Sequence, residues 1–139
     1  MQEENRNSKR ELKRGGLMFP KEQARKKHRA HAAHSILQSD HDRRRCWLCM
    51  QLRGDYSEHT VLHKHHIFGG HALRRISEAE GFFVWLCPEH HEFSGESAHT
   101  DRAIAAAMKA QAQTAYEKGH TREQFRQLMG RSYITDDGR

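Results

Sequence analysis

Two short cysteine–histidine segments constrain the fold of this chain of 139 residues more than any other feature. In "CWLC", Cys46 and Cys49 are three positions apart, and "CPEHH" gives Cys87 and His90 the same spacing. Side chains at this spacing reach one ion from a tight turn or from the first turn of a helix. The four together make a Cys₃His set, the closed tetrahedral type typical of structural Zn²⁺. Three ordinary buried thiols are the alternative, but two half-sites on so polar a chain favour zinc.

The cysteine count and the composition also favour a metal site over a disulfide. There are three cysteines, an odd number, and no segment has the pattern of a secretory leader. Hydrophobic residues make up 35% of the chain and charged residues 30%, so only a modest core can form, and a metal would stabilise it. No apolar run approaches the roughly 20 residues of a membrane span. We therefore expect a cytoplasmic protein with reduced thiols and no membrane partner.

Positive charge is concentrated near the N-terminus. Residues 1–45 contain 13 Lys and Arg against 6 Asp and Glu, whereas residues 46–139 contain 11 against 12. A basic arm on a near-neutral body suits a polyanionic partner such as DNA. Lys26, Lys27 and Arg29 are the expected phosphate contacts in this arm. An arm that only keeps the chain solvated is the alternative.

The distribution of Gly, Pro and apolar residues predicts an α+β protein. We expect a flexible tail (1–20), a basic helical arm (21–45, with its helix at 21–38), a zinc-stapled domain (46–134) and a short tail (135–139). Within the domain, strands at 59–68 and 81–87 are joined by a loop, and a short helix begins at Pro88. Two further helices are predicted at 101–118 and 121–130, the second with a Thr121–Gln124 capping box. The aromatic residues expected in the core are Trp47, Phe82, Phe83 and Trp85.

A second group of histidines lies close to the predicted zinc ligands. His91 follows His90, but neighbours on a helix point about 100° apart, so the two cannot easily serve one ion. His65 and His66 are adjacent in a predicted strand, and alternation sends them to opposite faces, so that one of them can meet His91. His99 can join from the following segment. Imidazoles without cysteine suit an open catalytic metal better than a closed structural one.

These motifs resemble those of the HNH endonucleases. The resemblance rests on "HKHHIFGG" (63–70) and "FFVWLCPEHH" (82–91), with "CWLC" as a common zinc-knuckle elaboration. "HHIFGG", a nearby "SE" and the helical ending are similar to a phage and prophage branch of the family. The resemblance covers about residues 46–134 and implies a ββα-metal core stapled by the Cys₃His site, with a basic N-terminal helix and two C-terminal helices. It also implies a phage-encoded enzyme that hydrolyses DNA phosphodiester bonds in the host cytoplasm and leaves 5′-phosphate and 3′-hydroxyl ends.

The resemblance assigns roles to the histidines. It makes His65 and His91 ligands of a catalytic divalent cation such as Mg²⁺ or Mn²⁺, with His99 as a candidate third ligand. It makes His66 the general base that takes a proton from the attacking water. Arg74 and Arg75, between the two strands, are expected to contact phosphates. A homo-oligomer, or a recombination or packaging partner, is also expected.

One departure from the family pattern keeps two alternatives open. HNH proteins usually have an asparagine between the histidine motifs, which braces the loop or orients the base, but residues 67–86 contain none. His71 and Ser77 are available to replace it. The alternatives are a catalytically idle zinc-stabilised module that binds nucleic acid and a zinc-stabilised adaptor that binds protein. We expect no functional role for His59, His63 or His120.

Overall fold

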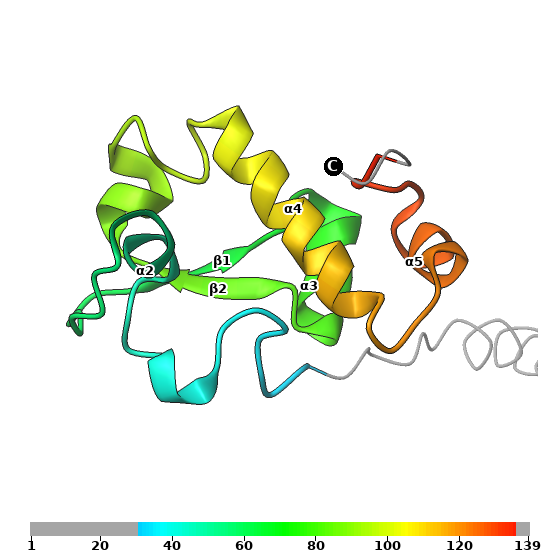
Figure 1. Ribbon diagram of the computed structural model, residues 1–139, viewed down its shortest axis with the longest axis horizontal. Coiled ribbons are helices and arrows are strands. Elements are labelled where there is room, and N and C mark those ends of the chain that lie inside the picture. Colours follow the sequence, from blue (N-terminus) through cyan, green and yellow to red (C-terminus); the bar gives the residue numbers. More distant parts are fainter. Residues whose placement is uncertain (1–30, 136–139) are drawn as a thin grey trace, which may run out of the picture.

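A two-stranded antiparallel sheet lies at the centre of the computed structural model, which describes residues 31–135 (Figure 1). Strand β1 (His63–His66) pairs with β2 (Phe83–Leu86), with His63 opposite Leu86 and His66 opposite Phe83. Both strands are shorter than predicted. Because side chains alternate along a strand, His63 and His65 share one face, and Lys64 and His66 share the other.

The connection between the strands is a helix, α3 (His71–Glu80), so the prediction of a loop there is wrong. Leu73 and Ile76, three positions apart, pack against the core from one side of this helix. The helix ends at Gly81, which has a φ of 80°. A Cβ at Gly81 would approach the His34 carbonyl to 2.5 Å, so this position requires glycine on both counts.

Several short helices lie around the sheet, and the chain ends in the long helix α4 and the short helix α5, which lies beyond the sheet (Figure 1). A 3₁₀ turn, η1 (Asp40–Asp42), precedes α2 (Trp47–Arg53), and a π-helical turn, η2 (Glu89–Phe93), follows β2. Helices α4 (Arg102–Tyr116) and α5 (Arg122–Met129) confirm the two predicted C-terminal helices. The predicted capping box is confirmed too, because Thr121 and Gln124 each bond the other's backbone N–H.

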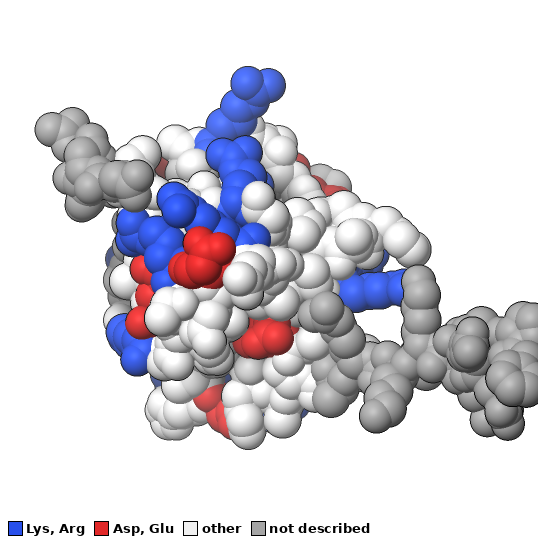
Figure 2. Space-filling model, turned by 90° about the vertical axis from the view of Figure 1, so that its right-hand side faces the viewer, with Lys and Arg blue, Asp and Glu red and all other residues white. Residues whose placement is uncertain are grey.

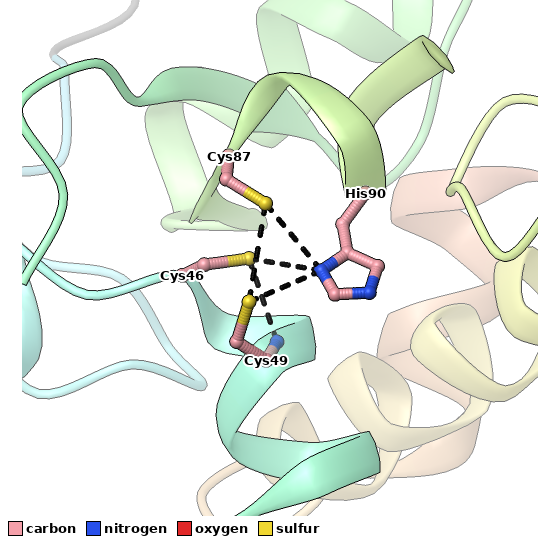
Figure 3. Close-up of side chains that lie close together, drawn as sticks. All are labelled: Cys46, Cys49, Cys87 and His90. Atoms are coloured by element: carbon pink, nitrogen blue, oxygen red, sulfur yellow. Dashed lines mark hydrogen bonds between the residues drawn. The ribbon is translucent and has the colours of Figure 1, made fainter. Parts of the chain in front are cut away.

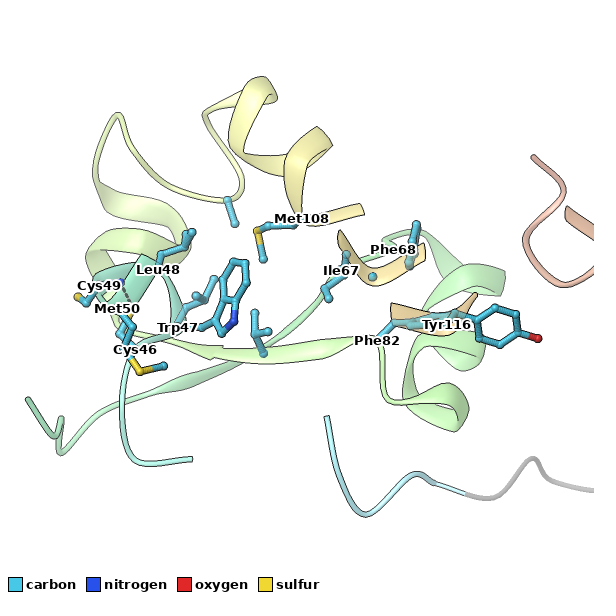
Figure 4. Close-up of a cluster of buried hydrophobic side chains, with 14 of the residues drawn as sticks. Cys46, Trp47, Leu48, Cys49, Met50, Ile67, Phe68, Phe82, Met108 and Tyr116 are labelled. Atoms are coloured by element: carbon cyan, nitrogen blue, oxygen red, sulfur yellow. Dashed lines mark hydrogen bonds between the residues drawn. The ribbon is translucent and has the colours of Figure 1, made fainter. Parts of the chain in front are cut away.

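The hydrophobic core runs from α2 to the aromatic residues around α3, α4 and α5 (Figure 4). Phe82 is fully buried and makes edge contacts with Phe68 and Tyr116, at centroid distances of 5.2 and 5.8 Å. Trp47 and Phe83 are buried as expected, whereas Trp85 is only partly buried. The core therefore extends to the cysteine-bearing helix, so loss of structure at either end would affect the other.

The described segment before η1 is irregular and bent rather than helical. The predicted helix over 21–38 is wrong for residues 31–38; the rest of it, with Lys26, Lys27 and Arg29, lies outside the described residues. The Ala32 and Ile36 N–H groups donate to carbonyls at the end of α3, and the Gln38 side chain accepts from the backbone N–H of Trp85. The Ala32 and Ile36 N–H groups thus have hydrogen-bond acceptors outside the segment, so they do not need the bonds of a helix. Among the described residues, no helix has the length and apolar character needed to cross a membrane.

Candidate metal centres

The structure brings the four predicted zinc ligands into one buried cluster (Figure 3). Cys46 is the N-cap of α2, and Cys49 lies in the first turn of that helix. Cys87 directly follows β2, and His90 lies in η2. None of the four is more than 6% exposed, and all three cysteines are free thiols.

The separations within this cluster match those of ligands around a zinc ion. The His90 Nδ1 atom lies 3.3 Å from the Cys49 sulfur and 3.5 Å from the sulfurs of Cys46 and Cys87. The Cys49 and Cys87 sulfurs are 3.9 Å apart. A zinc ion about 2.3 Å from sulfur and about 2.0 Å from nitrogen separates its tetrahedral ligands by about 3.5 Å (S–N) and about 3.8 Å (S–S). The cluster could therefore bind zinc with little rearrangement.

Electrostatics also favour a cation at the Cys₃His cluster. Burial, reinforced by the neighbouring Cys46, raises the pKa of Cys49, and burial also raises the pKa of Cys87. Burial lowers the pKa of His90, so this imidazole is neutral and can serve as a ligand. Three thiolates cannot exist together in so buried a place without positive charge. A divalent cation would supply that charge and stabilise the thiolates.

A second cluster consists of three histidines and no cysteine. Each of His65, His91 and His99 offers a ring nitrogen within 4.8 Å of the other two. The Nε2 atoms of His91 and His99 are 3.1 Å apart. Two nitrogens bound 2.0–2.1 Å from one ion lie about 3.0 to 3.4 Å apart, so this pair is spaced as ligands are.

The histidine cluster is open to solvent on one side. His65 is only 7% exposed, whereas His99 is an exposed residue. Burial, and then the neighbouring His99 and His91, lower the pKa of His65 to about 3. Burial is also the main cause of the lowered pKa of His91. Neutral imidazoles are the form that binds metal, and an exposed side leaves room for water or substrate.

The turn η2 separates the two clusters by directing adjacent histidines to different places. His90 joins the cysteines and His91 joins the histidines, the divergence expected for neighbours on a helix. The chain then folds back, since the Ala98 N–H donates to the His90 carbonyl at 2.7 Å. A longer bond of 3.4 Å joins the His99 N–H to the His91 carbonyl and helps to bring His99 to the cluster.

Sequence reasoning assigned no role to His63, yet this residue contacts the histidine cluster. The Nδ1 atoms of His63 and His91 are 3.0 Å apart, and the two rings meet edge to face. Strand alternation could have suggested the contact, because His63 and His65 are two positions apart and so share a face.

His66 projects from the opposite face of β1 and contacts Glu78 of α3. The His66 Nε2 and Glu78 Oε2 atoms are 2.5 Å apart, and Lys64 donates to the other carboxylate oxygen at 2.5 Å. Burial raises the pKa of Glu78, but the hydrogen bonds from Lys64, His66 and His31 outweigh it and hold the pKa at about 2. The carboxylate is therefore ionised at neutral pH. The sequence contained this residue in its "SE" pair, but nothing there indicated its partner.

The residues expected to replace the missing asparagine or to contact phosphate have different surroundings. Ser77 is buried and donates to the Phe68 carbonyl at 3.0 Å, which braces the loop after β1. His71 is exposed at the start of α3. Arg74 and Arg75 are exposed on α3, the helix that carries Glu78.

One cavity of the described residues lies away from both clusters. This cavity of about 470 Å³ is lined partly by Arg43, Arg44 and Trp85, and none of its lining residues belongs to either cluster. The histidine cluster has an exposed member, His99, so it is accessible to a large molecule. Comparisons of the chain with protein-family models, curated proteins and solved structures found no significant match.

Proposed function

We propose that the chain is a metal-dependent endonuclease of the HNH type that hydrolyses DNA phosphodiester bonds. One observation carries the proposal. Adjacent residues of one strand contribute His65 to an open cluster of three imidazoles and His66 to a pair with an ionised carboxylate. The neighbouring Cys₃His cluster would bind a structural zinc ion.

His66 is the proposed general base. Its Nε2 atom faces the Glu78 carboxylate, which favours the tautomer that carries a proton on Nε2 and leaves the lone pair on Nδ1. A histidine held in this way can take a proton from water at Nδ1, while the carboxylate stabilises the imidazolium that forms. Glu78 thus orients the base, the role that the absent asparagine often has in HNH proteins.

The open cluster is the proposed catalytic metal site. A divalent cation held by His65, His91 and His99 would neutralise charge on the scissile phosphate and the leaving oxygen. The ring nitrogens of these residues accept such ions without losing a proton, because burial lowers the pKa of both His65 and His91. His99, exposed at the rim, leaves the site accessible to a DNA strand.

DNA contacts in this proposal come from a few local groups of cations. Figure 2, which looks at the α5 side of the molecule, shows Lys and Arg side chains gathered on one part of that face beside acidic groups. Arg74 and Arg75 on α3 and the basic arm before residue 45 are the proposed phosphate contacts. Such contacts give affinity without reading sequence, so weak sequence preference is expected. A phage setting and a recombination or packaging partner are proposals from the resemblance alone.

The second candidate is a catalytically idle module that grips nucleic acid. Its supporting observation is the alternation of β1, which puts His65 and His66 on opposite faces of the sheet. A base on the far face from the metal cluster would have to reach the same phosphate around the edge of the hairpin. A module that only binds nucleic acid does not need the base and the metal ion to act on one phosphate.

Cleavage of supercoiled plasmid tests the proposal. Purified full-length protein would be assayed with Mg²⁺, Mn²⁺ and EDTA in parallel with His66→Ala and with His41→Ala, a matched control at an exposed histidine in η1. We expect metal-dependent nicking by wild type and His41→Ala and a loss of at least about 100-fold in His66→Ala. Full activity in His66→Ala would contradict the assignment of the base. Binding without any cleavage would favour the idle module.

A further inference from the structure

His91 uses both of its ring nitrogens, and only one of them faces the other ligands of the histidine cluster. Its Nε2 atom lies 3.1 Å from the Nε2 of His99. Its Nδ1 atom lies 3.0 Å from the Nδ1 of His63, on the strand that also carries His65. The ring is therefore held between a metal-ligand position on one side and another imidazole on the other.

The chemistry of imidazole fixes the direction of this contact when His91 binds an ion. A neutral imidazole has one N–H donor and one acceptor nitrogen. If the His91 Nε2 lone pair points at a cation, the proton must be on Nδ1, and the Nδ1 of His63 must accept it. The reverse arrangement would put the proton of His91 on Nε2 and block that nitrogen as a ligand.

We propose that His63 is a positioning residue for the histidine metal site, where it accepts a hydrogen bond from His91 Nδ1–H. The inference rests on the metal site of the proposed function, but it does not require that the protein cleave DNA. Metal-bound histidines generally donate their second N–H to such a partner, which fixes the tautomer and the ring orientation. The partner is more often a carboxylate or a carbonyl, so an imidazole in this position is a distinctive feature of the chain.

The surroundings leave His63 as the acceptor for His91. The Glu92 carboxylate is 4.0 Å from the same Nδ1 atom, beyond hydrogen-bond distance, and its side chain is 51% exposed. His63, by contrast, is held in the sheet opposite Leu86, the residue just before Cys87. The position of His63 is therefore tied to the rigid end of the Cys₃His cluster.

Two substitutions of His63 distinguish a role as hydrogen-bond acceptor from a role as metal ligand. The Oδ1 atom of an asparagine lies close to where His63 has its Nδ1, so His63→Asn keeps the acceptor. His63→Leu removes it at similar volume. Nickel binding to zinc-replete, full-length protein would be measured by calorimetry, with His91→Ala giving the background from other histidines and Glu92→Gln as the control for the carboxylate. Zinc content and melting temperature would verify the fold of each variant.

We expect nickel affinity to fall about 10- to 100-fold in His63→Leu and to recover to within a few-fold of wild type in His63→Asn. Glu92→Gln should bind as wild type does. Nitrogen-15 NMR of the nickel-free proteins should find the Nδ1–H tautomer of His91 enriched in wild type and His63→Asn relative to His63→Leu. These readings would support a positioning role, because a merely structural residue would not be rescued by a shorter polar side chain.

Three outcomes would overturn the inference. Wild-type affinity in His63→Leu would show that His91 needs no partner. Equal loss in His63→Asn and His63→Leu would make His63 a direct ligand rather than an acceptor. A wild type that binds no second ion would contradict the metal site and this inference together. Nickel binding with the expected pattern in a protein that cleaves no DNA would contradict only the nuclease.

Discussion

The two candidate metal clusters share one turn of chain but differ in almost every other respect. The Cys₃His cluster is buried, and the separations of its ligand atoms match those of a zinc tetrahedron. The histidine cluster has no sulfur and has an exposed member, His99. His90 and His91, adjacent in η2, belong to one cluster each. The proposed function implies a division of labour in which the closed cluster would maintain the fold and the open one would bind the catalytic ion.

Loss of one thiol from the closed cluster should have the largest effect. Structural zinc contributes about 10 to 16 kcal/mol of apparent binding free energy in small domains, comparable to or above the whole stability of a typical domain. Cys49→Ser is therefore expected to abolish the cooperative unfolding transition and to leave less than one zinc per chain. Circular dichroism melting and metal analysis would check both. A folded variant with normal melting would contradict a structural role for this cluster.

Chelation should empty the two clusters in a fixed order. The ligands of the closed cluster are buried, whereas the open one offers His99 to solvent, so EDTA should remove an ion from the histidine cluster first. We expect the early loss to change the melting temperature by only a few degrees and the later loss of zinc to unfold the protein. Stopped-flow chelation with parallel melting would measure this. Simultaneous loss of both ions would contradict the division of labour.

His91→Ala should be mild for the fold and severe for the second ion. The side chain is only partly buried, and its removal leaves His90 and the three cysteines in place. We expect a destabilisation of about 1 kcal/mol, with one zinc retained per chain and the second ion lost. Urea unfolding and metal analysis are the measurements. Cys49→Ser should lose the zinc, whereas His91→Ala should keep it. Loss of zinc in His91→Ala would contradict the independence of the two clusters.

The pH dependence of Glu78 should have the smallest effect on the two ion sites, because Glu78 pairs with His66 and Lys64 on the face of the sheet opposite the histidine cluster. Its pKa is about 2, below the ordinary 4.5, because hydrogen bonds outweigh the effect of burial. A carboxyl with a lowered pKa contributes stability that is complete above about pH 4.5 and disappears as the pH falls toward 2. The stability difference between wild type and Glu78→Gln should therefore be about 1 to 3 kcal/mol at pH 7 and shrink below pH 4.5.

Denaturant unfolding at pH 7, 5 and 4, with zinc in excess, would follow that difference. Both proteins contain the same Cys₃His cluster, so acid release of zinc affects them alike and cancels in the comparison. A difference that grows between pH 5 and pH 4 would contradict the hydrogen bonds that the ionised Glu78 carboxylate accepts from Lys64 and His66.

The parts of the site that sequence could predict depend on local spacing. Cys46, Cys49, Cys87 and His90 follow from the three-residue spacing of two half-sites, and the divergence of His90 from His91 follows from helix geometry. The C-terminal helices have clear caps and stops, such as the Thr121–Gln124 capping box. All of these signals act within a few residues, which is why they can be recognised without a fold.

The parts that sequence missed depend on partners distant in the chain. Residues 31–38 have good helix formers, but backbone bonds to the end of α3 and a bond from the Trp85 N–H to the Gln38 side chain hold them in an irregular, bent path. Helix α3 has only a weak signal in the sequence, because few of its positions are apolar, Leu73 and Ile76 among them. The contact of Glu78 with His66 depends on how α3 packs against β1, which cannot be read from spacing. Strand alternation indicates that His63 shares a face with His65, but its contact with the ring of His91 depends on the packing of η2.

A cobalt titration of the metal-free protein tests the central claim, two different ion sites in one turn, most directly. We expect the first equivalent of Co²⁺ to give intense sulfur-to-metal charge-transfer bands and a second equivalent to add only the weak bands of a nitrogen site. Cys49→Ser should abolish the first signal, and His91→Ala should abolish only the second. A single binding event, or thiolate bands that disappear in His91→Ala, would contradict the separation of the two sites.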